Sequence, residues 1–407
     1  MSPFQALKLP NGQTIDNRLA KAAMEENLAD TQQAPADALL RLYQAWAKGE
    51  AGLLLTGNVM IDRRAMTGPG GVVLEDERHL ERFRQWAAVG RAGGAQFWMQ
   101  LNHPGRQTMA NLGQQAWAPS AVALDLGAFS KMFAEPRPMN ESDIADVIQR
   151  FAASAALAEK AGFTGVQIHA AHGYLLSQFL SPLTNLRTDQ WGGALENRAR
   201  LLLAVVGAVR QAVSAQFCVA VKLNSADFQR GGFDADDARQ VIQWLNEHQV
   251  DLLELSGGSY EAPAMQGEAR DGRTLAREAY FLEMAEELAS VARMPVMVTG
   301  GIRRLAIVER VLDSGIAMAG IGTAMALEPH VVKHWREGRN SHPQLPPIHW
   351  KRKPLAALAT MAVVKFQLHR LSRGRKPRPQ VSALWALILD RLYIARRTRQ
   401  YRQAMAK

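Results

Sequence analysis

Short apolar segments alternate with longer amphipathic ones along most of the chain. Eight segments are nearly continuously apolar, as expected for parallel strands that are buried on both faces. They occupy residues 19–24, 52–59, 95–101, 165–169, 217–223, 251–256, 294–300 and 317–322. Between them, apolar residues recur three and four positions apart, which predicts amphipathic helices. The predicted helices cover 36–49, 77–93, 142–162, 196–213, 234–248, 276–293 and 304–315.

Residues typical of helix ends support these boundaries. Ser142 and Asp234 precede two of the periodic stretches, and Gly49, Gly162 and Gly315 follow others. A strand followed by a helix, repeated along the chain, implies parallel strands. An open doubly wound sheet has the same alternation, but eight regular units over about 330 residues favour a closed (β/α)8 TIM barrel. Its last helix would be the segment PHVVKHWREG.

In such a barrel, the loops that leave the C-terminal ends of the strands carry the function. The segment after the third strand, residues 102–140, is long. Long loops on this face are where a cover for the substrate would be built.

Composition narrows the kind of protein. The 407 residues include one cysteine, Cys218, which excludes an internal disulfide and a cysteine-ligated iron–sulfur cluster. The N-terminus lacks the basic and apolar regions of a secretory signal, and no window reaches the roughly 18 apolar residues that a membrane span needs. We therefore expect a soluble, cytoplasmic protein.

The positive charge belongs to the end of the chain. Residues 351–407 contain 15 Lys or Arg and one acid, Asp390, which gives +14; because the whole chain carries +10, the first 350 residues sum to −4. We therefore expect a barrel domain over 1–340 and a basic helical extension over 341–407, which begins with a proline-rich linker.

The role of this extension stays open. Its two amphipathic pieces are suited to packing on the barrel's outer helices or on a second subunit of a homo-oligomer. Contact with an anionic membrane surface is an alternative, as is docking beside the active site or gripping a phosphorylated ligand. Nucleic acid is not expected as a partner, because no recognised binding module accompanies the basic residues.

Two glycine-containing loops follow the last two strands. The seventh ends in Thr299-Gly300-Gly301 and the eighth in Gly320-Ile321-Gly322-Thr323. Glycine lets the backbone approach a ligand, and the loops after strands seven and eight of a barrel often bind phosphate. Together the two loops predict a phosphate site, although glycine at either turn alone is more often simple geometry.

Gln100 and Lys222 fall near the C-terminal ends of strands three and five. A glutamine amide at this place could pair with the edge of a heterocycle, and a lysine could meet a ligand oxygen or a ring charge. The alternative is that both side chains cap the barrel mouth with water.

The end of the fourth strand carries the most informative polar residues, in the sequence GVQIHAAHGYLLSQFLSP. His169, His172 and Tyr174 would lie on the functional rim. No third ligand accompanies the histidines at a recognisable spacing, so no metal site is predicted. Histidines held by loop backbone remain an alternative. The favoured interpretation is a pair of N–H donors for a substrate oxygen that gains negative charge, with a phenol nearby as proton donor.

At this point the sequence resembles the Old Yellow Enzyme family of flavin-dependent ene-reductases, related to NADH:flavin oxidoreductases. The resemblance covers nearly all of residues 8–340, and the segment from His169 to Leu203 is its most specific part. It rests on NRLAKAAMEENLAD, LTGN, WMQLNHPGRQ, APSAV, HAAHGYLLSQFLSPLTNLRTDQWGGALENRARLL, VKLNSADF, ELSGGSYE and TGGIR.

The resemblance implies a barrel that holds one non-covalent FMN. In this family the end of the first strand contacts the flavin, and the phosphate lies in the last two glycine loops. The positions that match flavin-binding ones are Ala22, Ala23, Met24, Glu25, Gly57, Gln100, Lys222, Gly300, Gly301, Gly322 and Thr323.

Two of these positions depart from the family pattern. Glu25 stands where a small polar residue, Thr or Cys, is usual; a carboxylate beside the flavin would lower its potential, unless Glu25 points elsewhere. Thr323 stands where Arg is common, which removes a bidentate phosphate clamp. FMN affinity would then be lower, or Arg303 would substitute.

The resemblance also implies a reaction. NAD(P)H reduces FMN, and the flavin passes hydride to the β-carbon of an alkene activated by a carbonyl or nitro group. His169 and His172 match the residues that hold the activating oxygen, and Tyr174 matches the proton donor. Amine oxidation or demethylation in the same barrel, and a non-catalytic flavin-binding scaffold, are the alternatives. Longer relatives with an iron–sulfur domain do not fit a chain with one cysteine.

Overall fold

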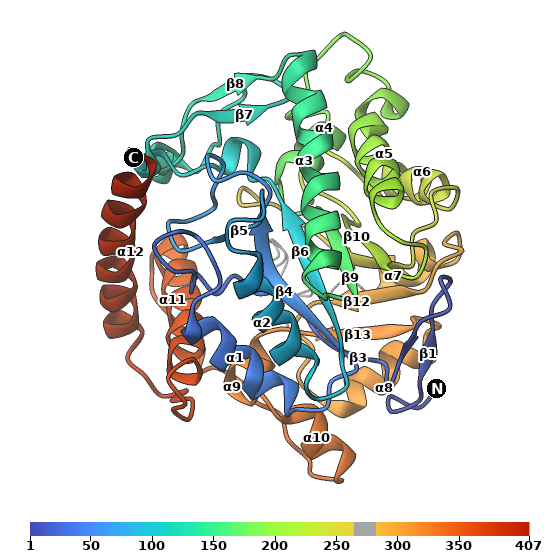
Figure 1. Ribbon diagram of the computed structural model, residues 1–407, viewed down its shortest axis with the longest axis vertical. Helices are drawn as coiled ribbons and strands as arrows, with labels where there is room; N and C mark the ends of the chain where they lie inside the picture. Colours follow the sequence, from blue (N-terminus) through green and yellow to red (C-terminus); the bar gives the residue numbers. More distant parts are fainter. Residues whose placement is uncertain (264–281, 407) are drawn as a thin grey trace.

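The computed structural model describes residues 1–263 and 282–406, and it has a ring of parallel strands at its centre (Figure 1). Neighbouring strands of the ring are all parallel, and pairing of the first with the second closes it. The ring consists of β3 (Leu19–Lys21), β4 (Leu53–Met60), β6 (Gln96–Asn102), β9 (Gly165–Ala170), β10 (Cys218–Asn224), β11 (Leu252–Ser256), β12 (Val296–Thr299) and β13 (Met318–Ile321). The predicted (β/α)8 barrel and its eight strands are confirmed.

Helices surround this ring at the predicted positions. They are α1 (Asp37–Ala47), α2 (Leu80–Arg91), α3 (Glu141–Lys160), α5 (Leu195–Ala212), α6 (Ala235–Leu245), α7 (Leu282–Ala289), α8 (Leu305–Asp313) and α10 (Val331–Arg336). The predicted helix over 276–293 begins outside the described residues. Two short helices were not predicted, α4 (Leu175–Leu180) and α9 (Thr323–Leu327).

Short strands and 3₁₀ turns lie outside the ring of eight strands. They are the strands β1 (Leu7–Lys8), β2 (Thr14–Ile15), β5 (Val72–Val73), β7 (Ala116–Ala118) and β8 (Pro136–Pro138), and three 3₁₀ turns at Gly105–Gln107, Ala110–Leu112 and Gly127–Met132. The β1–β2 hairpin packs Leu9 and Ile15 against Trp98 and other side chains of the barrel strands, in a cluster separate from the large outer core. The hairpin is therefore part of the interior packing of the barrel.

One predicted helix cap was wrong. Ser142 lies inside the first turn of α3, and Asn140 is the cap. The Asn140 side chain accepts a hydrogen bond from the Asp143 N–H, while the Asp143 carboxylate accepts one from the Asn140 N–H. This reciprocal capping box satisfies two backbone donors, which a serine two residues later could not do. Asp234 caps α6 as predicted.

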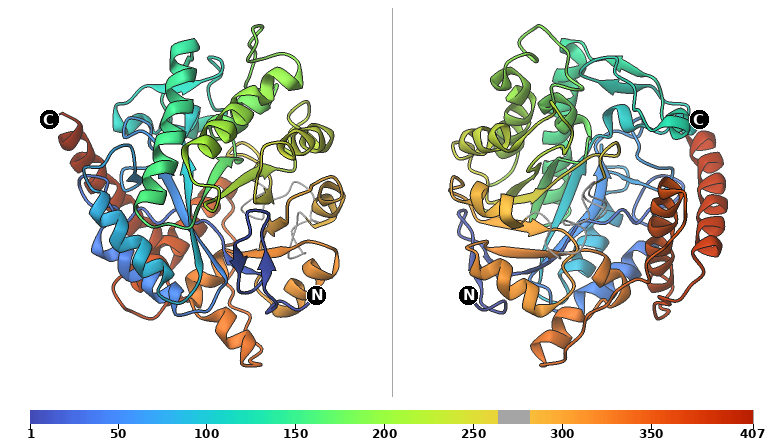
Figure 2. Two further views of the ribbon diagram at one scale, coloured as in Figure 1. Left: turned by 45° about the vertical axis from the view of Figure 1, so that its right-hand side comes forward. Right: turned by 180° about the vertical axis from the view of Figure 1, so that it is seen from behind.

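The end of the chain forms two long helices, α11 (Lys353–Leu371) and α12 (Ala383–Met405). Figures 1 and 2 show them side by side at one edge of the barrel, with α12 outermost. The Tyr393 hydroxyl donates to the Asn27 carbonyl at 2.6 Å, Arg397 donates to the Ala29 carbonyl at 2.8 Å, and Tyr401 donates to the Arg63 carbonyl at 2.5 Å. These acceptors lie in loops that follow β3 and β4, so α12 docks beside the functional rim.

Within the described residues, no helix has both the length and the apolar character that crossing a bilayer requires. The division into a barrel domain over 1–340 and an extension over 341–407 stays a prediction.

Candidate active site

The two rim histidines and Tyr174 come together at the end of β9. The ring centroids of His169 and His172 are 5.0 Å apart, and those of His169 and Tyr174 are 4.9 Å apart, both nearly perpendicular. His172 has a positive φ of 61°, which turns the chain sharply after the strand. The Asn224 side chain at the end of β10 accepts a hydrogen bond from the His172 N–H at 3.1 Å, which supports this conformation.

Hydrogen bonds orient both imidazoles. The His169 Nδ1 accepts from the Ala171 N–H at 3.2 Å, so in the neutral ring the proton is on Nε2. The His172 Nε2 lies 2.8 Å from the Ser256 hydroxyl. If Ser256 donates in this contact, His172 carries its proton on Nδ1. Each ring then keeps one N–H donor that backbone and serine do not use.

Burial keeps these groups uncharged. It lowers the pKa of both His169 and His172 well below the ordinary value, and the nearby Lys222 lowers them further. Burial also raises the pKa of the Tyr174 phenol well above its usual value, with smaller contributions from Tyr260 and Glu25. The site therefore offers neutral N–H donors and a protonated phenol at neutral pH.

Tyr260 is a site residue that the sequence reasoning missed. Its hydroxyl lies 3.0 Å from the Tyr174 hydroxyl, and the two rings meet nearly edge to face. Burial raises the pKa of Tyr260 too. Its place in the motif ELSGGSYE, four residues beyond the end of β11, puts it on the same rim as Tyr174. Tyr260 could therefore have been predicted as a site residue from its position just after the sixth strand.

A buried polar network lies directly below the rim. The Gln100 amide donates to the Gln167 oxygen, and the Gln167 amide donates to the Glu254 carboxylate, each at 2.7 Å. Lys222 Nζ donates to the same carboxylate at 2.8 Å and the Thr299 hydroxyl donates to it at 2.7 Å. Strand register explains the cluster, because Lys222 pairs with both His169 and Glu254 on neighbouring strands.

Gln167 and Glu254 were not predicted as site residues. Each lies two residues before a rim residue, His169 or Ser256, so the strand alternation places it on the same inward face. Glu254 provides the counter-charge for Lys222 inside the barrel. Gln100 and Lys222 are thus both held by hydrogen bonds inside the barrel, and their predicted contact with a heterocycle or with water stays a prediction.

The predicted flavin positions at the ends of the first two strands lie close together. Ala22, Ala23 and Met24 follow β3, and a side chain at Gly57 in β4 would collide with the Met24 carbonyl and the Glu26 carboxylate. The Gly57 N–H donates to Glu26 at 3.0 Å. A glycine is therefore required at 57 by this close approach.

The two glycine loops lie beside each other, because Thr299 on β12 pairs with Gly320 on β13. Gly301 has a φ of 67°, and a Cβ added to Gly322 would meet no atom within 4 Å. Gly322 therefore leaves open space beside its backbone, as a bound phosphate would need, and the phosphate site itself stays a prediction. Gly300 is buried, whereas the Thr323 side chain is exposed. Substitution of the phosphate clamp by Arg303 stays a prediction.

Glu25 lies in the wall of a cavity next to this site. Its carboxylate accepts from the Thr67 hydroxyl at 2.5 Å and lies 4.0 Å from Lys365 Nζ of α11. The cavity has a volume of about 480 Å³ and extends between the rim loops, α11 and α12. Tyr260 lines it and connects it to Tyr174. The C-terminal helices thus form one wall of the approach to the rim.

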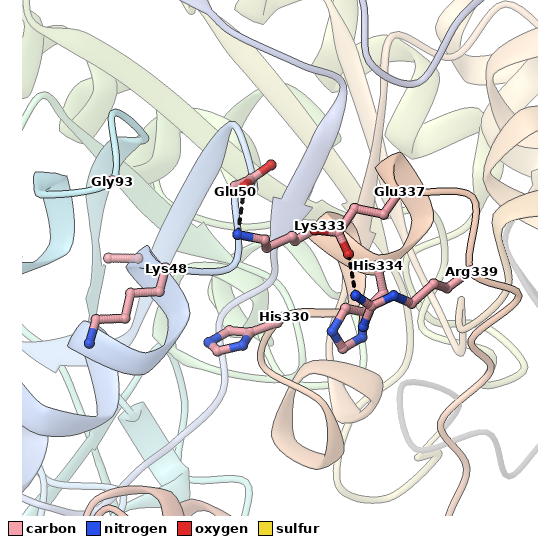
Figure 3. A pocket seen from close by; sticks show the side chains of 9 residues that line it. Lys48, Glu50, Gly93, His330, Lys333, His334, Glu337 and Arg339 are labelled. Atoms are coloured by element: carbon pink, nitrogen blue, oxygen red, sulfur yellow. Dashed lines mark ion pairs between the residues drawn. The ribbon is translucent and has the colours of Figure 1, made fainter.

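Another hollow of about 480 Å³ lies between α10 and the segments that precede β4 and β6 (Figure 3). Figure 3 shows Lys333 pointing to Glu50 and Arg339 pointing to Glu337, with distances of 3.4 Å and 2.8 Å. This is the face of a barrel that serves stability, and these charges pair with each other. Among the described residues, no group of three or more His, Cys, Asp or Glu side chains is arranged to hold a metal ion.

Comparison with known proteins identifies the family. Residues 3–342 match the model of the NADH:flavin oxidoreductase / NADH oxidase family. The chain belongs to this family. The Old Yellow Enzyme resemblance, the enzyme class and the FMN cofactor with a nicotinamide reductant are thereby confirmed as properties of the family to which it belongs.

Individual relatives agree with this assignment. The chain is 37% identical over 352 residues to the NADH-dependent flavin oxidoreductase iliE of Neonectria sp. (strain DH2), covering 80% of this chain but 46% of that protein. It is 37% identical over 322 residues to the NADH-dependent flavin oxidoreductase nadA of Aspergillus parasiticus, covering 76% of this chain and 72% of that protein.

A solved structure, a complex of 2-naphthoyl-CoA reductase with 2-naphthoyl-CoA, superposes with a TM-score of 0.76 at 25% identity. The match covers 83% of this chain and 52% of that one. The basic extension lies almost wholly beyond the residues that the family model matches.

The buried histidines make stability depend on pH. Burial lowers the pKa of His103 and of His369 to about 4 in the folded protein, against about 6.5 in the unfolded chain. Below pH 6.5 the unfolded chain binds the additional protons, so stability falls as the pH falls. We expect roughly 2 kcal/mol of loss for each such histidine between about pH 7 and pH 5.

Thermal unfolding at a series of pH values checks this expectation, with His369→Gln as the comparison. The variant should lose less stability than the wild type on acidification. An identical loss in the two proteins would show that His369 takes up its proton equally well in the folded state.

Proposed function

We propose that the protein is an ene-reductase that uses NAD(P)H to reduce an alkene activated by a carbonyl or nitro group. The observation that carries the proposal is the rim cluster of His169, His172 and Tyr174, which are mutually close, buried and uncharged. Neutral N–H donors stabilise an oxygen that becomes negative in the transition state without binding a ground-state anion tightly.

Each residue has one role in this proposal. His169 and His172 bind the activating oxygen, and their hydrogen bonds to Ala171 and Ser256 fix the ring orientation. Tyr174 holds the proton that the α-carbon receives. Tyr260 orients the Tyr174 hydroxyl by the hydrogen bond between the two phenols. Reduced FMN, when bound, supplies the hydride for the β-carbon.

The residues proposed to hold FMN are Ala22, Ala23, Met24, Glu25, Gly57, Gln100, Lys222, Gly300, Gly301, Gly322 and Thr323. The amide of Gln100 and the ammonium of Lys222 suit the polar edge of the isoalloxazine, and Glu254 and Gln167 hold these groups in place. Glu25 binds Thr67 and faces Lys365, which supports a place for it in the pocket wall.

Amine oxidation receives less support from the site. An amine substrate is a cation at neutral pH, so the site must either bind this cation or accept a proton from it. The rim presents N–H donors and a phenol with a raised pKa, and none of these accepts a proton readily. The arrangement favours a substrate with an acceptor oxygen.

Anaerobic half-reactions test the proposal. The purified flavoprotein is reduced with NADH or with NADPH and then mixed with cyclohexenone or a nitroalkene. Rapid reoxidation with formation of the saturated product is expected. Reoxidation by oxygen alone, with no enone or nitroalkene accepted, would refute the ene-reductase function.

A phenol that mimics the enolate probes the histidines separately from turnover. We expect His169→Ala/His172→Ala to weaken binding of such a phenol to the oxidised flavoprotein by roughly 100-fold or more, because two hydrogen bonds to a charged oxygen are lost. The long-wavelength charge-transfer absorbance of the bound phenol reports the affinity. Replacing His330, which lies in the hollow at the other end of the barrel, by Ala is the matched control and should leave the affinity unchanged.

A further inference from the structure

The outward face of α12 is apolar in its first half. Eight large apolar side chains are exposed among the described residues, and four of them lie on this helix. Leu384, Ile388 and Leu392 follow one another at intervals of four residues and so share a face, and Trp385 is their neighbour. The exposed fractions of the side chains are 58% for Leu384, 53% for Trp385, 41% for Ile388 and 63% for Leu392. Such a contiguous apolar stripe marks an interaction surface.

Basic side chains flank the stripe at both ends. Arg396, Arg399 and Arg402 are exposed on the second half of α12, and the loop before the helix exposes Arg373, Arg375, Lys376 and Arg378. The only carboxylate within α12, Asp390, is 9% exposed and lines the cavity on the inner side. Among the described residues of this helix, the outward face therefore presents positive charge and apolar surface together.

This combination determines the kind of partner. A second copy of the same face would bring arginines against arginines, which repel each other. The surface of an anionic bilayer supplies both negative headgroups for the arginines and an acyl boundary for leucine and tryptophan. On α12 the apolar residues and the arginines follow one another along the same outward face, so both can contact one membrane surface.

The inner side of the same helix faces the approach to the active site. Asp390, Arg391, Tyr393 and Ile394 line the cavity together with Met361 of α11. Met109, Leu126, Phe129, Met132 and Phe133 from the loop after β6 form an apolar part of the cavity wall, and Glu25, Asp125, Glu261 and Lys365 line the cavity as well. α12, about 10 Å across, lies between this cavity and the exposed stripe.

We propose that the outward face of α12 binds the surface of an anionic membrane, and that the enzyme takes a lipophilic activated alkene from this membrane into the cavity beside the helix. The second half of this proposal rests on the proposed function, whereas the membrane binding does not. The anchoring is peripheral, through one helix lying on the surface.

Vesicle flotation with the purified holoenzyme tests the binding. The protein should float with vesicles of phosphatidylcholine and phosphatidylglycerol in equal parts, stay behind with phosphatidylcholine alone, and be released by about 0.5 M NaCl. Arg396→Gln/Arg399→Gln/Arg402→Gln should weaken binding roughly 100-fold. The control Arg84→Gln/Arg293→Gln/Arg339→Gln removes three arginines that are 48%, 72% and 63% exposed elsewhere, and it should bind more tightly than the first variant by at least tenfold.

A second variant and a matched control test the apolar stripe. Trp385→Ser/Leu392→Ser should reduce binding at least tenfold, whereas Leu186→Ser, at a side chain exposed to 63% like Leu392, should not. All these side chains are exposed, so folding should survive, and retained flavin absorbance verifies it. Absence of binding to the anionic vesicles, or equal binding by the α12 variants and their controls, overturns the proposal. So does concentration-dependent dimerisation that Trp385→Ser/Leu392→Ser abolishes, because the stripe would then bind a second copy.

Turnover separates this inference from the proposed function. With a long-chain enone dissolved in anionic vesicles, Trp385→Ser/Leu392→Ser should be at least tenfold slower than the wild type, but equally fast with cyclohexenone in water. Equal rates with the long-chain enone would refute delivery from the membrane. If the wild type does not reduce cyclohexenone in water, the ene-reductase function is refuted. The result of the vesicle-binding experiment would still hold.

Discussion

Tyr174→Phe is expected to slow alkene reduction by about 10²- to 10⁴-fold, the usual contribution of a positioned proton donor. Burial holds the pKa of this phenol well above its ordinary value, so the hydroxyl is protonated at neutral pH and, in the proposed mechanism, gives its proton to the substrate carbanion. Reduction of the flavin by NAD(P)H needs no such proton and should be nearly unchanged. Rapid mixing of each half-reaction measures the two rates separately.

Tyr260→Phe is the matched control for this variant. It removes the hydroxyl 3.0 Å from that of Tyr174 but keeps the donor itself, so the enone reaction should slow much less. Unchanged enone reduction by Tyr174→Phe would exclude the tyrosine from proton transfer. An equal loss in both variants would indicate that the two phenols act as one unit.

The sequence was sufficient to predict the barrel because its signals are local. Eight apolar strand segments and the helices between them follow from periodicity, and they appear within a few residues of their expected bounds. The rim position of His169 followed from its place at the end of a strand. The cap of α3 was wrong, since Asn140 and Ser142 both have capping side chains and only the backbone geometry distinguishes them.

Partners across the barrel were harder to predict. Alternation along β11 puts Glu254 on the inner face, but its contacts with Lys222, Gln167 and Thr299 depend on the register between four strands. The docking of α12 depends on backbone carbonyls such as those of Asn27 and Ala29, which any residue type supplies. Because every residue type has a backbone carbonyl, the sequence does not show which ones accept hydrogen bonds from α12. Docking of the extension beside the rim was therefore one of several alternatives.

Lys222→Met is expected to cost 3–5 kcal/mol of stability, about the loss seen when one partner of a buried ion pair is removed. Lys222 and Glu254 are 4% and 0% exposed, so the remaining carboxylate would be buried with only the hydrogen bonds of Gln167 and Thr299 to compensate it. Denaturant unfolding of the apoprotein measures this loss without any contribution from bound flavin.

The double variant Lys222→Met/Glu254→Leu separates the structural role of the lysine from its role towards the flavin. Removing both charges leaves no isolated ion, so most of the stability should return. The cation proposed to lie beside the flavin edge is still absent, so the midpoint potential of bound FMN should be more negative than in the wild type. A potential equal to that of the wild type would place Lys222 outside the flavin site. Failure of the second substitution to restore stability would show that Glu254 tolerates the loss of its ion pair, and that the cost arises from packing around the lysine stem.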